Sequence, residues 1–151
     1  MAKRKKKQTV TKATLDRSFS LALRESYDYI CAYPECPMCG NYSLRYGGGL
    51  DTAHYYRRYR LSGRWHPDNC AALCRKIHNY LDEHPPELVA FFKALLGDTR
   101  HEWLMERHHQ TYRYPAGERY EMNQHYKAQI VKIDNLRMGG ETGPIVLTPW
   151  D

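Results

Sequence analysis

The sequence predicts an α+β fold with a small ββα centre flanked by helices. Three observations support this prediction. Apolar residues recur at three- and four-residue steps near the start and in the second half of the chain, which is typical of amphipathic helices. Between these segments, aromatic stretches on either side of a glycine run favour short strands and a turn. Two groups of cysteines frame the same region and indicate a structural metal within the ββα centre.

Length and composition limit the class of protein. At 151 residues the chain has the size of one domain with a single modest core. No apolar run is long enough to cross a bilayer, and the charged start "MAKRKKKQTV" is followed by no apolar segment of the kind found in secretory signals. Five cysteines in two groups fit metal ligands in a reducing compartment better than a disulfide framework. We therefore expect a soluble, cytoplasmic protein with no membrane partner.

The positive charge is concentrated at the N-terminus. The chain has 23 basic and 17 acidic residues, and six basic residues but no acid lie in the first twelve positions, so the remainder carries 17 of each sign. We expect residues 1–12 to form a disordered basic arm. The arm can be simply solvated or can follow a phosphate backbone, and both interpretations can hold together. The DNA-binding candidates in this arm are Lys3, Arg4, Lys5, Lys6 and Lys7.

The first half of the chain divides into a helix, a cysteine-containing turn and a strand region. The apolar periodicity of residues 13–30 predicts an amphipathic helix, which two prolines and a glycine in "CAYPECPMCGN" bring to an end. Residues 42–56 predict two short strands around a glycine-rich turn. Residues 61–69 predict a loop, and residues 70–84 predict a turn that leads into a helix.

Three further helices and an extended tail are expected in the second half. Pro86 suits the first position of a helix that the glycine of "ALLG" ends. Residues 98–110 open on an aspartate or threonine suited to cap another helix. An apolar stripe in residues 117–134 predicts the last helix, and residues 135–151 predict an extended tail. The folded domain is therefore expected over residues 13–134.

The "CPMCG" turn is the clearest metal-binding signal. Cys36 and Cys39 have the C-x-x-C spacing with which one loop gives two thiolates to a tetrahedral zinc, although redox-active pairs share this spacing. A second such pair is incomplete because Ile77 stands where a thiolate is needed. The alternative is a chain that has lost its zinc, with Ile77 in the core. The predicted zinc ligands are Cys36, Cys39, Cys74 and, as a fourth, either Cys70 or Cys31, of which Cys70 is expected to affect zinc occupancy.

Residues around the strand region suit phosphodiester hydrolysis. A neutral histidine near water is the usual general base near pH 7, and His54 is the candidate. A divalent cation can stabilise charge on the phosphate and on the leaving oxygen, and Asp51 offers it a carboxylate. Asn69 could close the connecting loop through backbone hydrogen bonds. His78 lies on the helix that follows Cys74. Every part of a one-metal nuclease site is thus present.

Arginine and aromatic residues alternate directly after His54. This composition suits contacts with phosphates and stacking on bases. In the other interpretation, a strand packs its tyrosines on the core and turns its arginines to water, and both interpretations can hold together. The DNA-binding candidates in this stretch are Arg57, Arg58, Arg60 and Arg64.

Several stretches, taken in order, resemble a known family. They are "LDRSFSLALRE", "CPMCG", "DTAHY", "DNCAALCRKIHNYL", "WLMERHH" and "HYKAQI". Together they are similar to the NinG (Rap) recombination endonucleases of lambdoid phages, which are HNH, or His-metal finger, nucleases. The resemblance spans about residues 15–133. The Asp-x-x-His pattern is also similar to that of phage Holliday-junction resolvases of the endonuclease VII type.

The resemblance implies a ββα-metal fold in which His54 is the general base, Asp51 and His78 bind Mg²⁺ or Mn²⁺, and Asn69 braces the loop. The chain departs from the NinG pattern twice, since that pattern has cysteine at Ile77 and generally asparagine at His78, where other HNH enzymes have histidine. We expect a phage DNA endonuclease that cuts branched recombination intermediates in the host cytoplasm, with phage or host recombination proteins as partners. The alternative is a zinc-containing nucleic-acid-binding module without catalysis.

Overall fold

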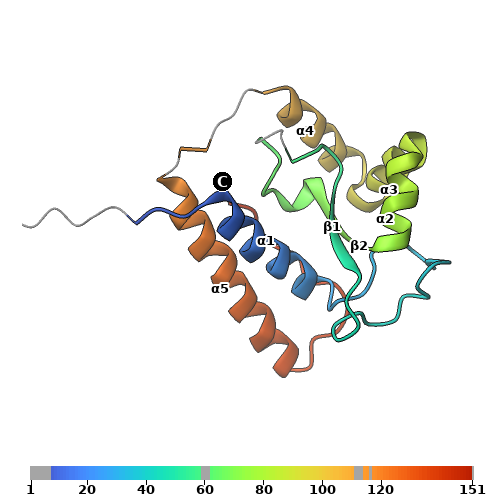
Figure 1. Ribbon diagram of the computed structural model, residues 1–151, viewed down its shortest axis with the longest axis horizontal. Coiled ribbons are helices and arrows are strands. Elements are labelled where there is room, and N and C mark those ends of the chain that lie inside the picture. Colours follow the sequence, from blue (N-terminus) through green and yellow to red (C-terminus); the bar gives the residue numbers. More distant parts are fainter. Residues whose placement is uncertain (1–7, 59–61, 111–113, 116, 151) are drawn as a thin grey trace, which may run out of the picture.

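The computed structural model describes residues 8–58, 62–110, 114, 115 and 117–150. Within that part, the protein is a mixed α+β fold of five helices and a two-stranded sheet (Figure 1). The mixed fold class predicted from the sequence is therefore confirmed. The predicted DNA-binding residues Lys3–Lys7 and Arg60 lie outside the described residues.

An antiparallel pair of strands lies at the centre of the fold. Strand β1 (Leu50–His54) pairs with β2 (Cys70–Cys74) so that Leu50 lies opposite Cys74 and His54 opposite Cys70. The partner of β1 therefore comes from the far side of the following loop, and a short 3-10 helix (Pro67–Asn69) leads into it. The expected hairpin within residues 42–56 is wrong, because residues 42–49 contain turns and no strand.

Strand β2 runs directly into helix α2 (Arg75–Glu83), and Cys74 is both the last strand residue and the N-cap of the helix. The turn expected at the start of residues 70–84 is thus a strand. All five residues of β2 are buried, so the segment lacks the alternation of apolar and polar residues that marks a strand with one solvent-exposed face. The order strand, loop, strand, helix places α2 beside β1, and these two elements position the site described below.

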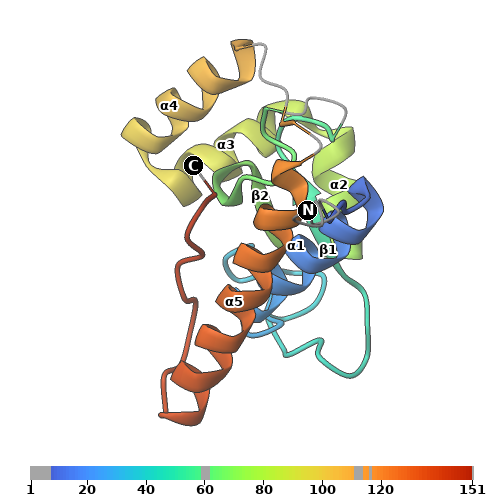
Figure 2. The same cartoon turned by 90° about the vertical axis from the view of Figure 1, so that its left-hand side faces the viewer.

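Helices α1 (Lys12–Ser26) and α5 (Glu118–Met138) lie side by side (Figures 1 and 2). Thr11 caps α1 by accepting a hydrogen bond from the N–H of Thr14. The helix ends four residues before its expected end, because Asp28 and Tyr29 adopt φ angles of 52° and 56° that no α-helix continues. The first core lies between these helices and includes Leu15, Phe19, Leu23, Trp65, Met122 and Tyr126.

Helices α3 (Pro85–Leu96) and α4 (Asp98–His109) follow α2 and surround a second core. Pro85, rather than the expected Pro86, occupies the first position of α3, where its missing N–H costs nothing. Gly97, at φ 77°, separates the two helices and is the N-cap of α4, so the expected side-chain cap at the start of residues 98–110 is not formed. The second core also receives the sheet and includes Leu50, Leu73, Ile77, Leu81, Phe92 and Leu104.

The C-terminal segment returns along the α1–α5 pair. Helix α5 continues four residues past the predicted boundary, and residues 139–150 form neither helix nor strand. The N–H of Ile145 donates to the carbonyl of Ser26 at 2.8 Å, and Leu147 is buried in the first core. The expected extended tail is therefore packed on the protein. None of the described helices has the length and apolar character needed to cross a bilayer.

Candidate metal sites and active-site pocket

Four cysteines from two distant segments converge on one point. The sulfurs of Cys31, Cys36, Cys39 and Cys74 lie within 4.8 Å of one another. The sulfurs of Cys36 and Cys74 are 3.8 Å apart. Four sulfurs placed tetrahedrally about 2.3 Å from a zinc ion are separated by about 3.8 Å, so this distance fits the ion. The cluster can hold a structural metal such as zinc.

The fourth member of this cluster is Cys31, and the expectation that Cys70 fills that position is corrected. Cys70 and Cys74 occupy opposite ends of β2 rather than adjacent turns of a helix. Because a strand rises about 3.3 Å per residue, the two cysteines are roughly 13 Å apart. Burial raises the pKa of the Cys70 thiol well above its usual range, and the residue packs in the first core as a small apolar side chain.

Asn41 holds the cysteine turn in place. Its Oδ1 accepts a hydrogen bond from the N–H of Cys36 at 2.7 Å, and its Nδ2 donates to the carbonyls of Cys31 at 3.0 Å and Tyr33 at 2.8 Å. The φ angle of Asn41 is 56°, a conformation that asparagine tolerates better than most residues. The sequence analysis missed this residue, and the available signal was an asparagine directly after the glycine of "CPMCG".

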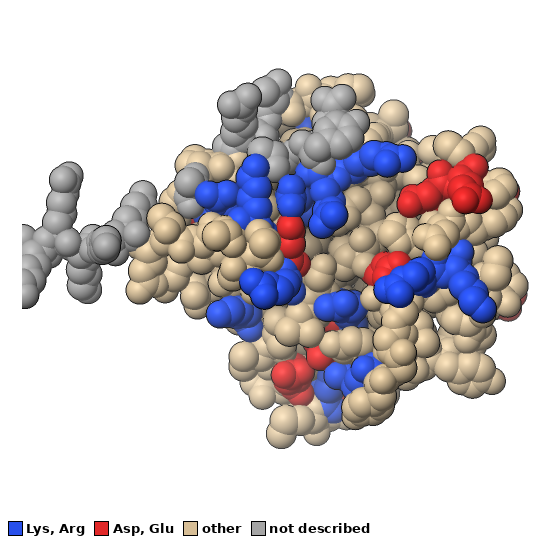
Figure 3. Space-filling model, in the orientation of Figure 1, with Lys and Arg blue, Asp and Glu red and all other residues tan. Residues whose placement is uncertain are grey.

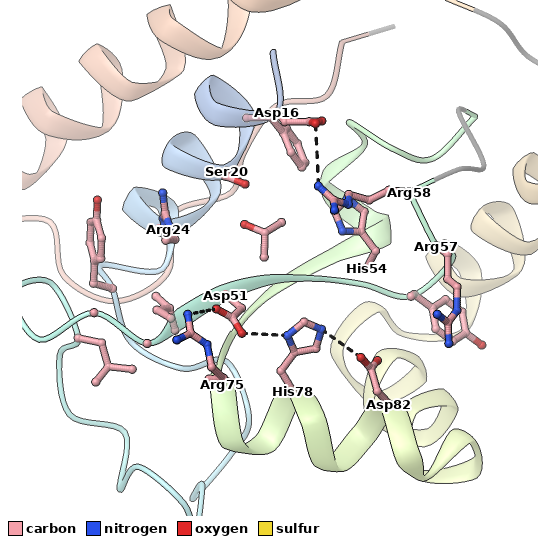
Figure 4. Close-up of a pocket in the computed structure, with 18 of the residues that line it drawn as sticks. Asp16, Ser20, Arg24, Asp51, His54, Arg57, Arg58, Arg75, His78 and Asp82 are labelled. Carbon is pink, nitrogen blue, oxygen red and sulfur yellow. Dashed lines mark hydrogen bonds and ion pairs between the residues drawn. The ribbon is translucent and has the colours of Figure 1, made fainter. Parts of the chain in front are cut away.

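Asp51 on β1 and His78 on α2 are in direct contact (Figure 4). Nδ1 of His78 lies 3.1 Å from Oδ2 of Asp51, and Nη2 of Arg75 donates to the other carboxylate oxygen at 3.0 Å. The second ring nitrogen of His78 is 3.6 Å from Oδ2 of Asp82. Burial alone would raise the pKa of Asp51, but the hydrogen bonds from Arg75 and His78 outweigh burial and lower that pKa. Asp51 is therefore an ionised carboxylate at neutral pH.

His54 lies at the end of β1, and its ring is fixed by a backbone contact. Nε2 donates a hydrogen bond to the carbonyl of Arg64 at 3.0 Å. Because a carbonyl can only accept, the neutral ring carries its proton on Nε2 and keeps a free lone pair on Nδ1. Burial lowers the pKa of His54, since the charged imidazolium loses hydration there. His54 is therefore neutral at pH 7 and able to accept a proton.

Asn69 closes the loop between the two strands. Its side chain is fully buried, and its Oδ1 accepts from the N–H of Tyr56 at 2.8 Å. Its Nδ2 donates to the carbonyls of Tyr56 at 2.9 Å and Gly63 at 3.0 Å. These are the backbone hydrogen bonds that the sequence predicted for Asn69. A Cβ atom at Gly63 would stand 3.0 Å from Nδ2 of Asn69, so any larger residue there would have to displace the Asn69 amide by a few tenths of an ångström.

The arginines that follow His54 differ in their surroundings. Arg57 and Arg58 are exposed. Arg64 turns inward, where its Nε and Nη2 donate to the two carboxylate oxygens of Asp16 at 3.0 and 2.6 Å. The indole N–H of Trp65 donates to the same carboxylate at 2.8 Å. Arg64 thus joins α1 to the loop, and DNA binding by this residue stays a prediction.

One open pocket of about 1070 Å³ collects these side chains. Asp51, His54 and His78 all line it, whereas Asn69 and the four clustered cysteines are not among its lining residues. Lysine and arginine side chains surround the hollow on the face that Figure 3 shows. Helix α1 contributes lining residues that the sequence analysis missed. The available signal was polar residues at four-residue spacing, which places them on one face of the helix. The missed lining residues include Asp16, Ser20, Arg24, Arg75 and Asp82.

The side chains of the pocket offer ligands for a cation, positive charge for an anion and an acceptor for a proton. It combines a carboxylate–imidazole pair, a neutral histidine with a free lone pair and several guanidinium groups. Comparison of the chain with protein-family models, with curated proteins and with solved structures finds no match. The chemistry of the site is therefore inferred from its own side chains.

Proposed function

We propose that the protein is a divalent-metal-dependent DNA endonuclease of the HNH, or ββα-metal, type. One observation carries the proposal, namely that Asp51, His54 and His78 line a single pocket although they come from a strand and from the helix beyond its partner strand. Asn69 supports the proposal because it braces the loop between those strands. The order β1, β2, α2 also agrees with the ββα-metal arrangement that the sequence resemblance implies.

Asp51 and His78 fit a Mg²⁺ or Mn²⁺ ion as ligands. Oδ2 of Asp51 and Nδ1 of His78 are 3.1 Å apart. Neighbouring ligands of an octahedral Mg²⁺ with bonds of about 2.1 Å are separated by about 3.0 Å. With a metal on Nδ1, the neutral ring would carry its proton on Nε2, the nitrogen that faces Asp82. Two protein ligands also leave room for water and phosphate oxygens, which Mg²⁺ prefers over an all-protein shell.

The neighbours of this pair would orient it for binding. Asp82 lies beside the second ring nitrogen of His78, and Arg75 holds the second oxygen of Asp51. A carboxylate beside the distal nitrogen of a metal-binding histidine fixes the tautomer and raises the basicity of the ligand. The donor set is thus supported by a second layer of polar contacts.

His54 would act as the general base. Its Nδ1 accepts a proton from the attacking water, while the carbonyl of Arg64 holds the opposite nitrogen and stabilises the imidazolium that forms. The water oxygen bonds to phosphorus, the bond to the leaving oxygen of the next nucleotide breaks, and that oxygen takes a proton from solvent. A bound divalent cation supplies charge stabilisation at the phosphate and at the leaving oxygen.

A nucleic-acid-binding module without catalysis is the second candidate, and one observation favours it. Arg75 and His78 both engage Asp51, so its negative charge is satisfied by the protein itself. Calorimetric titration with Mg²⁺ and Mn²⁺ separates the two candidates. Binding that disappears in Asp51→Ala supports the nuclease, and the absence of binding in the wild type supports the module.

Cleavage assays on supercoiled, linear and four-way-junction DNA, with and without Mg²⁺, test the nuclease directly. Because general-base catalysis contributes about a hundred- to ten-thousandfold, His54→Ala should lose visible cleavage and keep its DNA affinity. His109→Ala, which removes an exposed histidine at the end of α4, is the matched control and should cut at the wild-type rate. Wild-type cleavage by His54→Ala would refute the assignment. Preferential cutting of the junction would support branched DNA as the substrate, which the resemblance to NinG suggests.

A further inference from the structure

Helix α1 forms one wall of the pocket, although it lies outside the ββα unit. Asp16, Ser20 and Arg24 recur every four residues, so they share one face of the helix, and all three line the pocket (Figure 4). Asp16 is engaged with Arg64 and Trp65. Ser20 and Arg24 remain facing the pocket, and in the view of Figure 4 Arg24 lies on the side of Asp51 away from Arg57.

Two polar atoms in this pocket lack partners. Among the described residues, neither Nε of Arg24 nor Oγ1 of Thr52 has a hydrogen-bond partner, although both atoms are buried. Buried polar atoms are nearly always satisfied, so an unsatisfied pair that lines one pocket indicates a polar ligand that completes them. Arg24 also makes no ion pair within the described part of the chain, which leaves its charge available to an anion.

The other arginines of the pocket divide into paired and available groups. Arg45 is paired with Glu25 and Asp28, and Arg75 is paired with Asp51. Arg57 and Arg58 are exposed and lie just beyond the end of β1. Among the described residues, the only acidic side chain at ion-pair distance from either of them is Asp16, which lies 4.0 Å from Arg58. Available positive charge is thus found at both ends of the pocket, and the Asp51–His78 pair lies between (Figure 4).

We propose that Arg24, with the hydroxyls of Ser20 and Thr52, binds a backbone phosphate on one side of the scissile bond, while Arg57 and Arg58 bind phosphates on the other side. The inference rests on the proposed function and specifies its substrate class. The first and last residues of a five-residue strand are roughly 13 Å apart at about 3.3 Å per residue. Each strand of duplex DNA carries a phosphate about every 3.4 Å along the axis, so about four phosphates fit this distance. The substrate is therefore the interior of a strand, and a mononucleotide ester or a strand end would leave one side empty.

Equilibrium binding of a DNA duplex without added Mg²⁺ or Mn²⁺ tests Arg24 in a state where no strand is cut. Each neutralised phosphate contributes about 0.9 to the slope of log affinity against log salt concentration. Arg24→Ala should lower this slope by about 0.9, and Arg24→Lys should restore most of it because the positive charge is kept. Arg17→Ala is the matched control, since Arg17 lies exposed on the same helix outside the pocket, and its slope should stay at the wild-type value.

A scan with single methylphosphonate substitutions locates the phosphate. In the wild type, a neutral linkage should weaken binding at positions on both sides of the linkage that lies at the Asp51–His78 pair. In Arg24→Ala, the penalty should vanish on one side alone, an effect that a merely structural role of Arg24 would not produce. Melting curves of Arg24→Ala and Arg24→Lys establish that the variants are folded.

The outcomes separate this inference from the proposed function. A lower slope and a one-sided loss in the scan support the phosphate site even in a protein that cuts no DNA. An unchanged slope in Arg24→Ala, or an identical methylphosphonate profile in wild type and variant, overturns the phosphate site even if the protein is a nuclease.

Discussion

Removal of the Asn69 side chain should destabilise the protein strongly. Asn69→Ala eliminates three hydrogen bonds of 2.8 to 3.0 Å and leaves one N–H and two carbonyls of the strand connection without their partner. A hydrogen bond contributes about 0.5–1.5 kcal/mol net, so three of them predict a loss of about 3 kcal/mol. At about 2–4 °C per kcal/mol for a domain of roughly this size, the melting temperature should fall by about 6–12 °C.

Chemical denaturation of a small variant set measures this effect. Asn79→Ala, which truncates an exposed asparagine on α2, is the control and should change the free energy of unfolding by less than about 0.5 kcal/mol. Gly63→Ala should cost about 1–3 kcal/mol because the added methyl group would press on the Asn69 amide at 3.0 Å. In the double variant the second change should cost less than it does alone, because the amide that the methyl group meets is gone.

Two results would refute the reasoning. If Asn69→Ala loses no more stability than Asn79→Ala, the amide does not hold the loop. If the effects of Asn69→Ala and Gly63→Ala simply add, the two residues are not in contact.

Four further predictions concern the metals and the base. Metal analysis should find about one zinc per chain in the wild type and in Cys70→Ser, because Cys70 lies outside the cysteine cluster. Cys31→Ser should contain much less zinc. Equal zinc contents in the two variants would contradict the cluster. Burial lowers the pKa of His54 below 6.5, so the neutral base persists in mild acid. The acidic limb of the pH profile of kcat/KM should therefore have its midpoint below pH 6.5. A midpoint above that value would show a charged His54 in the free protein. The unfolded chain takes up this proton first, so His54 should also make stability fall as pH drops from 6.5 towards its folded-state pKa. Asp82→Asn should weaken Mg²⁺ binding about 10- to 100-fold in calorimetry, and unchanged affinity would show that Asp82 does not orient His78.

The parts of the fold that depend on local periodicity were predictable, and the parts that depend on long-range pairing were not. The helices over residues 85–96 and 98–109 follow from apolar spacing and from Gly97 between them. Strand β2 was missed because all its side chains are buried, so the segment has no period-two pattern. The same error affected the zinc ligands, since Cys70 lies close to Cys74 only if the segment is helical. The contact between Asp16 and Arg64 spans 48 residues, and no local pattern encodes it.

The candidate site shows the same division. Asp51, His54, Asn69 and His78 could be named from their residue types and order together with the resemblance to HNH nucleases, because general bases, metal ligands and loop braces have few chemical alternatives. The sequence could not show that Asp51 and His78 would be 3.1 Å apart, because that distance depends on how α2 packs beside β1. Nor could it show that α1 would complete the pocket.

The pocket has walls that belong to two different cores. The wall formed by α1 is anchored in the core shared with α5, whereas β1 and α2 contribute Leu50, Ala53, Ile77 and Leu81 to the other core. The hydrogen bonds of Asp16 with Arg64 and Trp65 form one polar contact between α1 and the loop that connects the two strands. Local separation of the two walls at such a contact requires less free energy than global unfolding. On heating, the width of the pocket should therefore change first, so that the proposed DNA cleavage should disappear at a temperature at which calorimetry still finds both cores folded.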